Sequence, residues 1–233
     1  MENEDDFLNI FNQVNFEVQR REVCERCKRP STVCLCHHLP KELIKLQNTV
    51  LHIFQHPNEE NRPLHTVAIL KAALCSESCK INKGRRFCRL CPDLSKTLSQ
   101  TNTFLLYPGQ GAKNIEDVVS NASKESVFNV VLIDGTWKQA SSIYAQNKFL
   151  QELQKVQLNS TGISEYVIRT QPTENSLSTV ECAALALEYT EESKDIKEIL
   201  LQPLRSLCQF QLDHGATKHH SKEYIENNKK NRS

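Results

Sequence analysis

The amino-acid sequence predicts an α/β fold with a mostly parallel sheet and helices on both faces. Short apolar runs, which are typical of buried strands, alternate along the chain with longer segments of helical spacing. Such alternation favours parallel strands joined by crossover helices, which cover both faces of the sheet. A cluster of cysteines precedes the alternation, so we expect a small metal-binding knuckle before the α/β domain.

Composition narrows the class of protein. The 233 residues are 39% hydrophobic and 24% charged, as in a globular protein, and the net charge is +1. No apolar run approaches the roughly 18 residues of a membrane span. The first residues, MENEDDFLNIF, lack the basic flank and apolar stretch of a signal peptide. We expect no membrane association, no secretion, a cytoplasmic and/or nuclear location and no obligate protein partner.

The chain divides into four predicted units. Residues 1–22 are expected to form an N-terminal helix and 23–40 a zinc knuckle. Residues 41–215 form the α/β domain, and 216–233 a polar C-terminal tail. Eight of the ten cysteines lie between residues 24 and 91, so the front of the chain differs chemically from its rear. Clustered cysteines in a reducing compartment are more often metal ligands than disulfides.

Five segments are predicted as strands. The clearest is 129–137, NVVLIDGTW, whose apolar run fits a strand buried on both faces. Two others stop at turn residues, 49–57 at His-Pro and 103–109 at Pro-Gly. Residues 156–159 and 165–172 supply further strand material.

Four segments are predicted as helices: 62–74, 138–153, 178–192 and 194–215. Thr136 with Gln139, and Ser178 with Glu181, match capping boxes at the starts of the second and third. Pro203 lies inside the last, where it predicts a kink, and Gly215 follows as a C-cap residue.

The strongest metal signal is the set Cys24, Cys27, Cys34 and Cys36. Each short pair lets two sulfurs bind one ion, and the spacer can fold back to complete a tetrahedron, which predicts structural Zn²⁺. His37 or His38 could replace one sulfur. The alternative is a set of unligated thiols.

A weaker set surrounds the basic sequence KGRRF in a stretch, 75–96, that is predicted to be irregular. Its spacing is C-x3-C-x8-C-x2-C, and the candidate second zinc ligands are Cys75, Cys79, Cys88 and Cys91. A zinc ion there would present arginines on a rigid loop.

Polar residues follow several predicted strands, and ligands in α/β folds bind beyond the carboxyl ends of parallel strands. Four such ends are expected in one crevice: 55–57, 107–109, 134–137 and 169–172. Asp134 is a candidate base or hydrogen-bond acceptor for a substrate N–H. The alternative is that it caps the next helix, although Thr136 competes for that position. Trp137 could equally be a core anchor. The chain has no glycine-rich dinucleotide motif and no Walker lysine motif.

The residues Asp134-Gly135-Thr136-Trp137 form a D-x-T-W signature. Five further segments accompany this signature in the order typical of one family: CERCKRPSTVCLC, IFQHPNEENRPLHT, LLYPG, YVIRTQPTENSLSTVECAA and LLQPLRSLCQFQLDHG. Over about residues 24–215 the chain therefore resembles the DTW-domain family of tRNA-uridine aminocarboxypropyltransferases, in particular its eukaryotic members. The second cysteine set is not a general feature of that family.

The resemblance implies transfer of the 3-amino-3-carboxypropyl group from S-adenosylmethionine to N3 of a D-loop uridine in tRNA. The product would be acp3U, with methylthioadenosine released. It also implies a SPOUT-like, knotted α/β fold, with 41–215 as the DTW catalytic domain. The catalytic residues would be Asp134, Thr136 and Trp137, with the acid removing the N3 proton or holding the uracil, and the indole stacking on adenine or uracil.

Further roles are implied for the cofactor and the RNA. Adenosine would lie on the loop from Leu106 and Tyr107 to Gly109 and on the turn around Gln171. The methionine carboxylate would meet Arg62 and Arg169, whose donor forks match two oxygens. Ser178 and Thr179 open a helix towards the same crevice, with Glu181 against the amino group. The expected tRNA-phosphate contacts are Lys83, Arg85, Arg86 and Arg89.

Two other functions remain open at this point. A SPOUT-type RNA methyltransferase would use the same cofactor but transfer its methyl group. A zinc-dependent RNA-binding module would bind RNA without catalysis.

Overall fold

The computed structural model describes residues 22–87, 92–123, 126–159, 163–173 and 176–230. The helix predicted over residues 1–22 lies almost wholly outside these ranges and stays a prediction. So does the knot. Among the described residues, no helix is long and apolar enough to cross a membrane.

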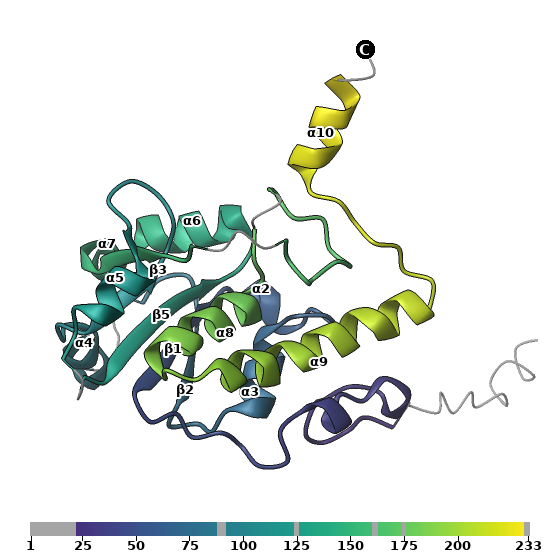
Figure 1. The fold of residues 1–233 in the computed structure, drawn as a ribbon, viewed down its shortest axis with the longest axis horizontal. Coiled ribbons are helices and arrows are strands. Elements are labelled where there is room, and N and C mark those ends of the chain that lie inside the picture. The colour runs from purple at the N-terminus through teal and green to yellow at the C-terminus, as the bar shows by residue number, and fades with distance from the viewer. Residues whose placement is uncertain (1–21, 88–91, 124–125, 160–162, 174–175, 231–233) are drawn as a thin grey trace, which may run out of the picture.

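A six-stranded sheet forms the centre of the molecule, in the order β2-β1-β5-β3-β6-β4 (Figure 1). Its strands are β1 (Thr49–Gln55), β2 (Cys79–Lys83), β3 (Thr103–Leu106), β4 (Lys113–Asn114), β5 (Phe128–Asp134) and β6 (Gln154–Gln157). Every neighbouring pair is parallel. The predicted sheet is therefore confirmed, and its strands all point their carboxyl ends towards one edge.

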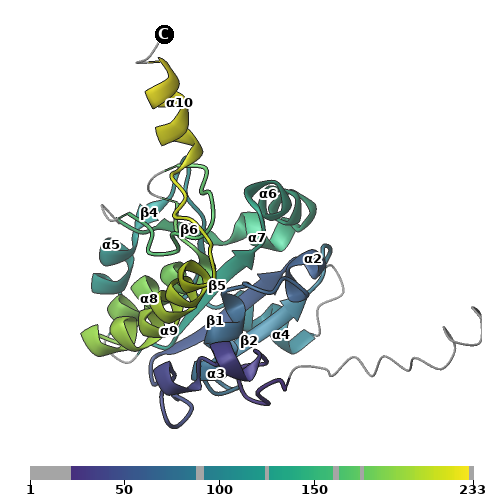
Figure 2. The ribbon, with the colours of Figure 1, turned by 90° about the vertical axis from the view of Figure 1, so that its right-hand side faces the viewer.

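Nine α-helices accompany the sheet in the described residues. They are α2 (Pro57–Glu60), α3 (Val67–Ala73), α4 (Pro92–Leu98), α5 (Ile115–Ser120), α6 (Trp137–Gln146), α7 (Lys148–Glu152), α8 (Thr179–Thr190), α9 (Lys194–Asp213) and α10 (Lys222–Lys230). Figure 2 shows α8 and α9 on one side of the sheet and α6 and α7 on the other. Helices on both faces are confirmed.

Alternate residues of the strands belong to two hydrophobic clusters. Val130 and Leu132 of β5 pack with α3, α8 and α9, while Val131 between them packs with α4, α6 and α7. This division follows from the pleat, which points successive side chains to opposite faces. Burial on both faces explains why the middle of β5, residues 130–133, is apolar at every position.

Some predicted elements are wrong. The stretch 75–96 is not irregular throughout, because it contains β2 and α4. β2 is an edge strand with only its first residue buried, so it lacks the apolar run that marks β1 and β5. Conversely, 165–172 is not a strand. Its apolar residues Tyr166, Val167 and Ile168 pack on the main cluster without joining the sheet.

Helix boundaries also differ from expectation. The segment predicted as one helix to residue 153 is divided into α6 and α7 at Asn147. The Asn147 side chain donates to the carbonyl of Ile143 at 2.6 Å and to that of Arg85 at 2.9 Å. Its Oδ1 accepts from the N–H of Phe87 at 2.7 Å. The Asn147 side chain thus joins the end of α6 to the loop after β2. These contacts interrupt the helix at this residue.

The predicted polar C-terminal tail contains a helix. This helix, α10, stands away from the sheet in Figures 1 and 2. The residues before it lie along the loop 167–172. The N–H of His219 donates to Val167 O at 2.8 Å, and that of Lys222 to Gln171 O at 2.9 Å. The tail therefore returns to the carboxyl edge of the sheet.

Candidate functional site

A cavity of about 410 Å³ lies at the carboxyl edge of the sheet. The ends of β3 and β5, the loop 166–172 and the start of α8 contribute to its wall. Residues from three of the four predicted segments line it, those at 107–109, 134–137 and 169–172. The fourth, 55–57, borders the site through Gln55 rather than lining the cavity.

Asp134 ends β5 and is buried in the cavity wall, with 7% of its surface exposed. Its Oδ2 accepts a hydrogen bond from the Gln55 side chain at 2.9 Å. Its Oδ1 accepts one from the Thr179 hydroxyl at 2.6 Å. An ionised carboxylate has about four acceptor positions, so two remain for a ligand. β1 and α8 thus fix the orientation of an acid that can still accept a proton or a hydrogen bond.

The next residues begin α6 with the predicted capping box. The Thr136 hydroxyl accepts from the N–H of Gln139 at 3.3 Å, and the Gln139 side chain accepts from the N–H of Thr136 at 2.6 Å. Asp134 is therefore free of the capping role. A Cβ on Gly135 would lie 3.0 Å from that of Gln139, so the tight box favours glycine there.

Trp137 is the first residue of α6 and lines the cavity with 46% of its surface exposed. It is not a core anchor. A large indole that remains exposed at a cavity is suited to stacking on a flat ligand.

Most of the residues predicted to bind the cofactor line this cavity: Leu106, Tyr107, Arg169, Gln171, Ser178 and Thr179. Gly109 follows the lining loop but is not part of the wall. Arg62 also lies outside the wall, where its Nη1 is 3.2 Å from Oε2 of Glu59.

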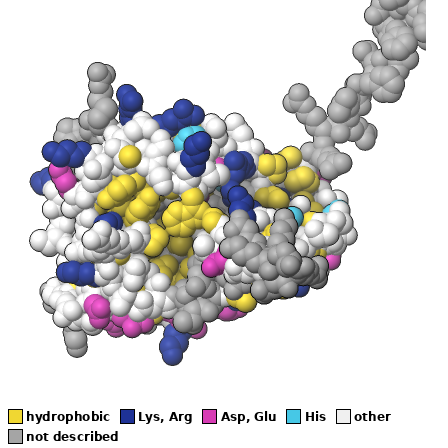
Figure 3. Space-filling view, turned by 90° about the horizontal axis from the view of Figure 1, so that it is seen from above, with side chains coloured by type: hydrophobic (Ala, Val, Ile, Leu, Met, Phe, Trp, Pro, Cys, Tyr) yellow, Lys and Arg dark blue, Asp and Glu magenta, His cyan; other side chains and the backbone are white. Residues whose placement is uncertain are grey.

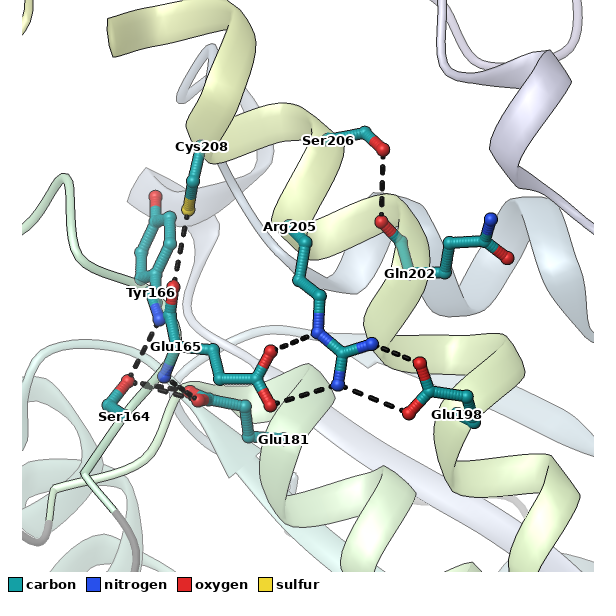
Figure 4. A network of polar contacts seen from close by, with 9 residues as sticks. All are labelled: Ser164, Glu165, Tyr166, Glu181, Glu198, Gln202, Arg205, Ser206 and Cys208. Carbon is teal, nitrogen blue, oxygen red and sulfur yellow. Dashed lines mark hydrogen bonds and ion pairs between the residues drawn. The ribbon is translucent and has the colours of Figure 1, made fainter.

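Glu181 is buried away from the cavity, although its helix begins there. Figure 4 shows its carboxylate beside Ser164 and the backbone of Glu165. It accepts from the Ser164 hydroxyl at 2.8 Å, from the N–H of Glu165 at 2.6 Å and from the N–H of Ser178 at 2.7 Å. The structure thus gives Glu181 a capping role and does not bring it to the cavity. Nearby, Arg205 pairs with Glu165 and Glu198.

The wall residues that sequence reasoning missed include Glu59, His65, Lys138, Tyr166 and Lys222. Burial raises the pKa of the Tyr166 hydroxyl to about 12 and lowers the pKa of the His65 imidazole. Glu59 follows the predicted strand end His56-Pro57, which was the available signal for that residue. Nothing in the sequence indicates Lys222, because only the folded chain brings the tail to this edge.

Positive charge surrounds the cavity. Arg169, Lys138 and Lys222 line it, whereas Glu59 and Asp134 are its acids. Figure 3 views the molecule from above and shows hydrophobic side chains gathered in the middle of this face, with Lys and Arg side chains around them. An apolar centre bordered by Lys and Arg side chains suits a flat aromatic ligand that carries anionic groups.

The predicted RNA contacts lie at the end of β2 and in the loop after it, at the same edge of the sheet. Lys83, Arg85 and Arg86 are exposed, and Arg89 lies outside the described residues. Lys83 pairs with Glu60, and Arg86 Nε donates to the Gln146 side chain at 2.9 Å. The N–H of Gly84 donates to Gln55 O at 3.0 Å, which ties this loop to the end of β1.

The first cysteine set is brought together as predicted. The ligand atoms of Cys24, Cys27, Cys34 and Cys36 all lie within 4.8 Å of one another. Two sulfur pairs are 3.4 and 3.6 Å apart, close to the roughly 3.8 Å expected between ligands bonded at about 2.3 Å to a tetrahedral zinc. The four thiols can therefore hold a metal ion. His37 and His38 are not part of this group.

The second cysteine set cannot be assembled from the described residues, because Cys88 and Cys91 lie outside them. Cys79 is buried, and the Cys75 sulfur lies 3.2 Å from the Ser78 hydroxyl. A second metal site stays a prediction.

Residues 21–212 match the family model of the DTW domain. A tRNA-uridine aminocarboxypropyltransferase 2 from Macaca fascicularis is 45% identical over 208 residues, which cover 89% of this chain and 69% of that protein. The protein of the same name from Drosophila melanogaster is 43% identical, covering 88% and 81%. A tRNA-uridine aminocarboxypropyltransferase A from Arabidopsis thaliana is 28% identical, covering 82% and 81%. No solved structure matches the chain.

Proposed function

Because the chain belongs to the DTW-domain family, we infer that it acts as its curated relatives are named, as a tRNA-uridine aminocarboxypropyltransferase. The family match and the 43–45% identical relatives extend over most of the chain. The observation that carries the assignment to this cavity is Asp134, buried at its wall and oriented by Gln55 and Thr179.

We propose that the donor is S-adenosylmethionine. The cavity of about 410 Å³ lies within the range of roughly 300–1,000 Å³ that is usual for small-molecule sites. Adenosine would lie against the loop that contains Leu106 and Tyr107, and the turn at Gln171 would close over it. The Arg169 guanidinium would bind the methionine carboxylate through two parallel hydrogen bonds.

The acceptor is the N3 atom of a tRNA uridine. Its N–H must lose a proton before nitrogen can attack the γ-carbon of the donor, and the two free acceptor positions of Asp134 suit that proton. As the N–C bond forms, the C–S bond breaks and its electrons pass to sulfur, so methylthioadenosine leaves. Trp137 would stack on the uracil or the adenine.

The tRNA would approach over the basic surface at the carboxyl edge. A base that reacts inside such a cavity must leave its stack, and its phosphates then lie on the rim. Arg85 and Arg86 follow β2 at the carboxyl edge, and Lys138 lines the cavity. Shape and phosphate contacts, rather than base sequence, would place a D-loop uridine.

The cysteine knuckle would hold Zn²⁺, for which a four-thiolate tetrahedral set is usual. Its Leu35 and Leu39 are buried in the main cluster, and Arg26 donates to Ala72 O in α3 at 3.2 Å. The ion would therefore keep this small segment folded against α9 and α3. None of the four cysteines lines the cavity, so the proposed role of the zinc ion is structural.

The test is a reaction of the purified protein with S-adenosylmethionine and unmodified tRNA, followed by nucleoside mass spectrometry. We expect a uridine that has gained an aminocarboxypropyl group, together with methylthioadenosine. A uridine that gains a methyl group, with S-adenosylhomocysteine, would instead identify a methyltransferase. Binding of tRNA without any product would identify a non-catalytic RNA-binding module.

A further inference from the structure

Glu59 is a buried acid of the cavity wall that the reaction described above does not use. It lies in α2, only 3% of its surface is exposed, and it lines the same cavity as Asp134 and Arg169. One carboxylate oxygen, Oε2, lies 3.2 Å from Nη1 of Arg62. The other, Oε1, is buried and has no hydrogen-bond partner among the described residues.

An unpartnered buried carboxylate oxygen is uncommon, since the lost hydrogen bonds to water are not replaced. The contrast with Glu181 is direct, because four N–H or hydroxyl groups satisfy that carboxylate within 2.8 Å. Burial raises the pKa of the Glu59 carboxyl, the nearby Asp134 adds to this, and Arg62 and Arg169 oppose it. A cationic ligand group would supply the donor that Oε1 lacks.

Glu59 and Arg169 carry opposite charges in one cavity wall, yet no ion pair joins them in the described structure. The unpartnered Oε1 of Glu59 and the Arg169 guanidinium together match a ligand that carries both an ammonium and a carboxylate. The aminocarboxypropyl end of the proposed donor has these two groups on one carbon atom.

Resting on the proposed function, we propose that Glu59 binds the α-ammonium group of S-adenosylmethionine while Arg169 binds its carboxylate. This assigns to Glu59 the contact that the sequence suggested for Glu181. The γ-carbon lies two bonds from the carbon that carries the ammonium. Anchoring the ammonium beside Asp134 therefore brings the γ-carbon to the uracil N3. The sulfonium methyl group has no such anchor. Glu59 therefore selects the aminocarboxypropyl group for transfer.

Calorimetric binding of two ligands tests the contact without relying on turnover. S-adenosylmethionine has the aminocarboxypropyl group, and methylthioadenosine has the same adenosine and sulfur without it. We expect Glu59→Gln to weaken S-adenosylmethionine roughly tenfold to 100-fold, the range for loss of a charged hydrogen bond, and to leave methylthioadenosine unchanged. Glu60→Gln is the matched control, because Glu60 adjoins Glu59 in α2 but does not line the cavity. It should change neither affinity.

The outcomes separate the two proposals. If the wild-type protein does not bind S-adenosylmethionine, the proposed donor is wrong and the Glu59 contact falls with it. If the wild type binds it and Glu59→Gln binds it equally well, or loses both ligands equally, only the Glu59 contact is overturned. Should Glu59→Gln fail to fold by circular dichroism, Glu59→Asp keeps the charge on a shorter side chain. A selective loss of S-adenosylmethionine affinity in that variant supports the contact, and unchanged affinity contradicts it.

Discussion

The cysteine knuckle and the cavity are assembled in opposite ways. The knuckle takes its four sulfurs from one short stretch, residues 24–36, in which they lie within 4.8 Å of one another. The cavity takes its wall from residues between Glu59 and Lys222, which meet only because β1, β3 and β5 run parallel to one edge. Local spacing therefore builds the metal group, and sheet topology builds the cavity.

This difference predicts different consequences for substitutions. Loss of a sulfur should affect folding, because the knuckle has little core of its own and depends on its ligands. Loss of a cavity side chain should affect ligand binding or chemistry, because the sheet positions that carry it are held by the two hydrophobic clusters.

The largest expected effect is on stability, from Cys27→Ser in the knuckle. Structural zinc contributes about 10 kcal/mol or more to the folding of zinc-finger peptides, so loss of one thiolate should unfold this segment and lower the melting temperature. Mass spectrometry of the native protein should show one fewer zinc ion than in the wild type. Thr32→Ala, an exposed change within the same knuckle, is the control and should retain the metal. An unchanged zinc content in Cys27→Ser would contradict the site.

The next effect is on catalysis, from Asp134→Asn. The amide keeps the size of the side chain but removes the base, which should lower kcat roughly 100-fold to 10,000-fold. Initial rates of uridine modification measure the loss, and circular dichroism checks the fold. Asp117→Asn, at an exposed position of α5, should leave the rate unchanged. Full activity in Asp134→Asn would remove this residue from the mechanism.

A smaller effect is expected for Trp137→Ala. Stacking contributes about 1–3 kcal/mol per base, so KM for the ligand that stacks should rise roughly fivefold to 100-fold. Stability should change little because nearly half of the indole is exposed. Separate KM values for tRNA and for S-adenosylmethionine show which ring it contacts. If neither KM rises and the melting temperature falls instead, Trp137 has a packing role.

The smallest effect is expected for Arg85→Ala at the rim. Loss of one phosphate contact should weaken tRNA binding several-fold and lower the slope of log affinity against log salt by about one. Fluorescence anisotropy at several salt concentrations measures both. Lys45→Ala, an exposed change before β1 at the opposite edge of the sheet, should leave the slope unaltered. Equal slopes for the two variants would place the tRNA elsewhere.

The sequence predicted those parts of the molecule that depend on local pattern. The apolar runs of β1, β3 and β5, both capping boxes and the first cysteine set all depend on residues close together in the chain. Asp134 could be identified because it ends the most strongly apolar of these runs.

Features that depend on distant contacts were not predictable in this way. β2 is an edge strand of mixed sequence, which is identified by its pairing with the backbone of β1 rather than by an apolar run. Glu181 matched a capping box and also a ligand contact. Its bond from Ser178 belongs to that box, but its donors from Ser164 and Glu165 lie in a distant loop that no local pattern indicates. Lys222 reaches the cavity because the tail hydrogen-bonds to the loop 167–172.

The most direct test of the proposed reaction follows the atoms of the donor. S-adenosylmethionine labelled at its carboxyl carbon, and a second sample labelled at its methyl carbon, are each incubated with the protein and unmodified tRNA. We expect label in the tRNA from the carboxyl-labelled donor alone, with the methyl label recovered in methylthioadenosine. Label in the tRNA from the methyl-labelled donor, or from neither, would contradict aminocarboxypropyl transfer by this protein.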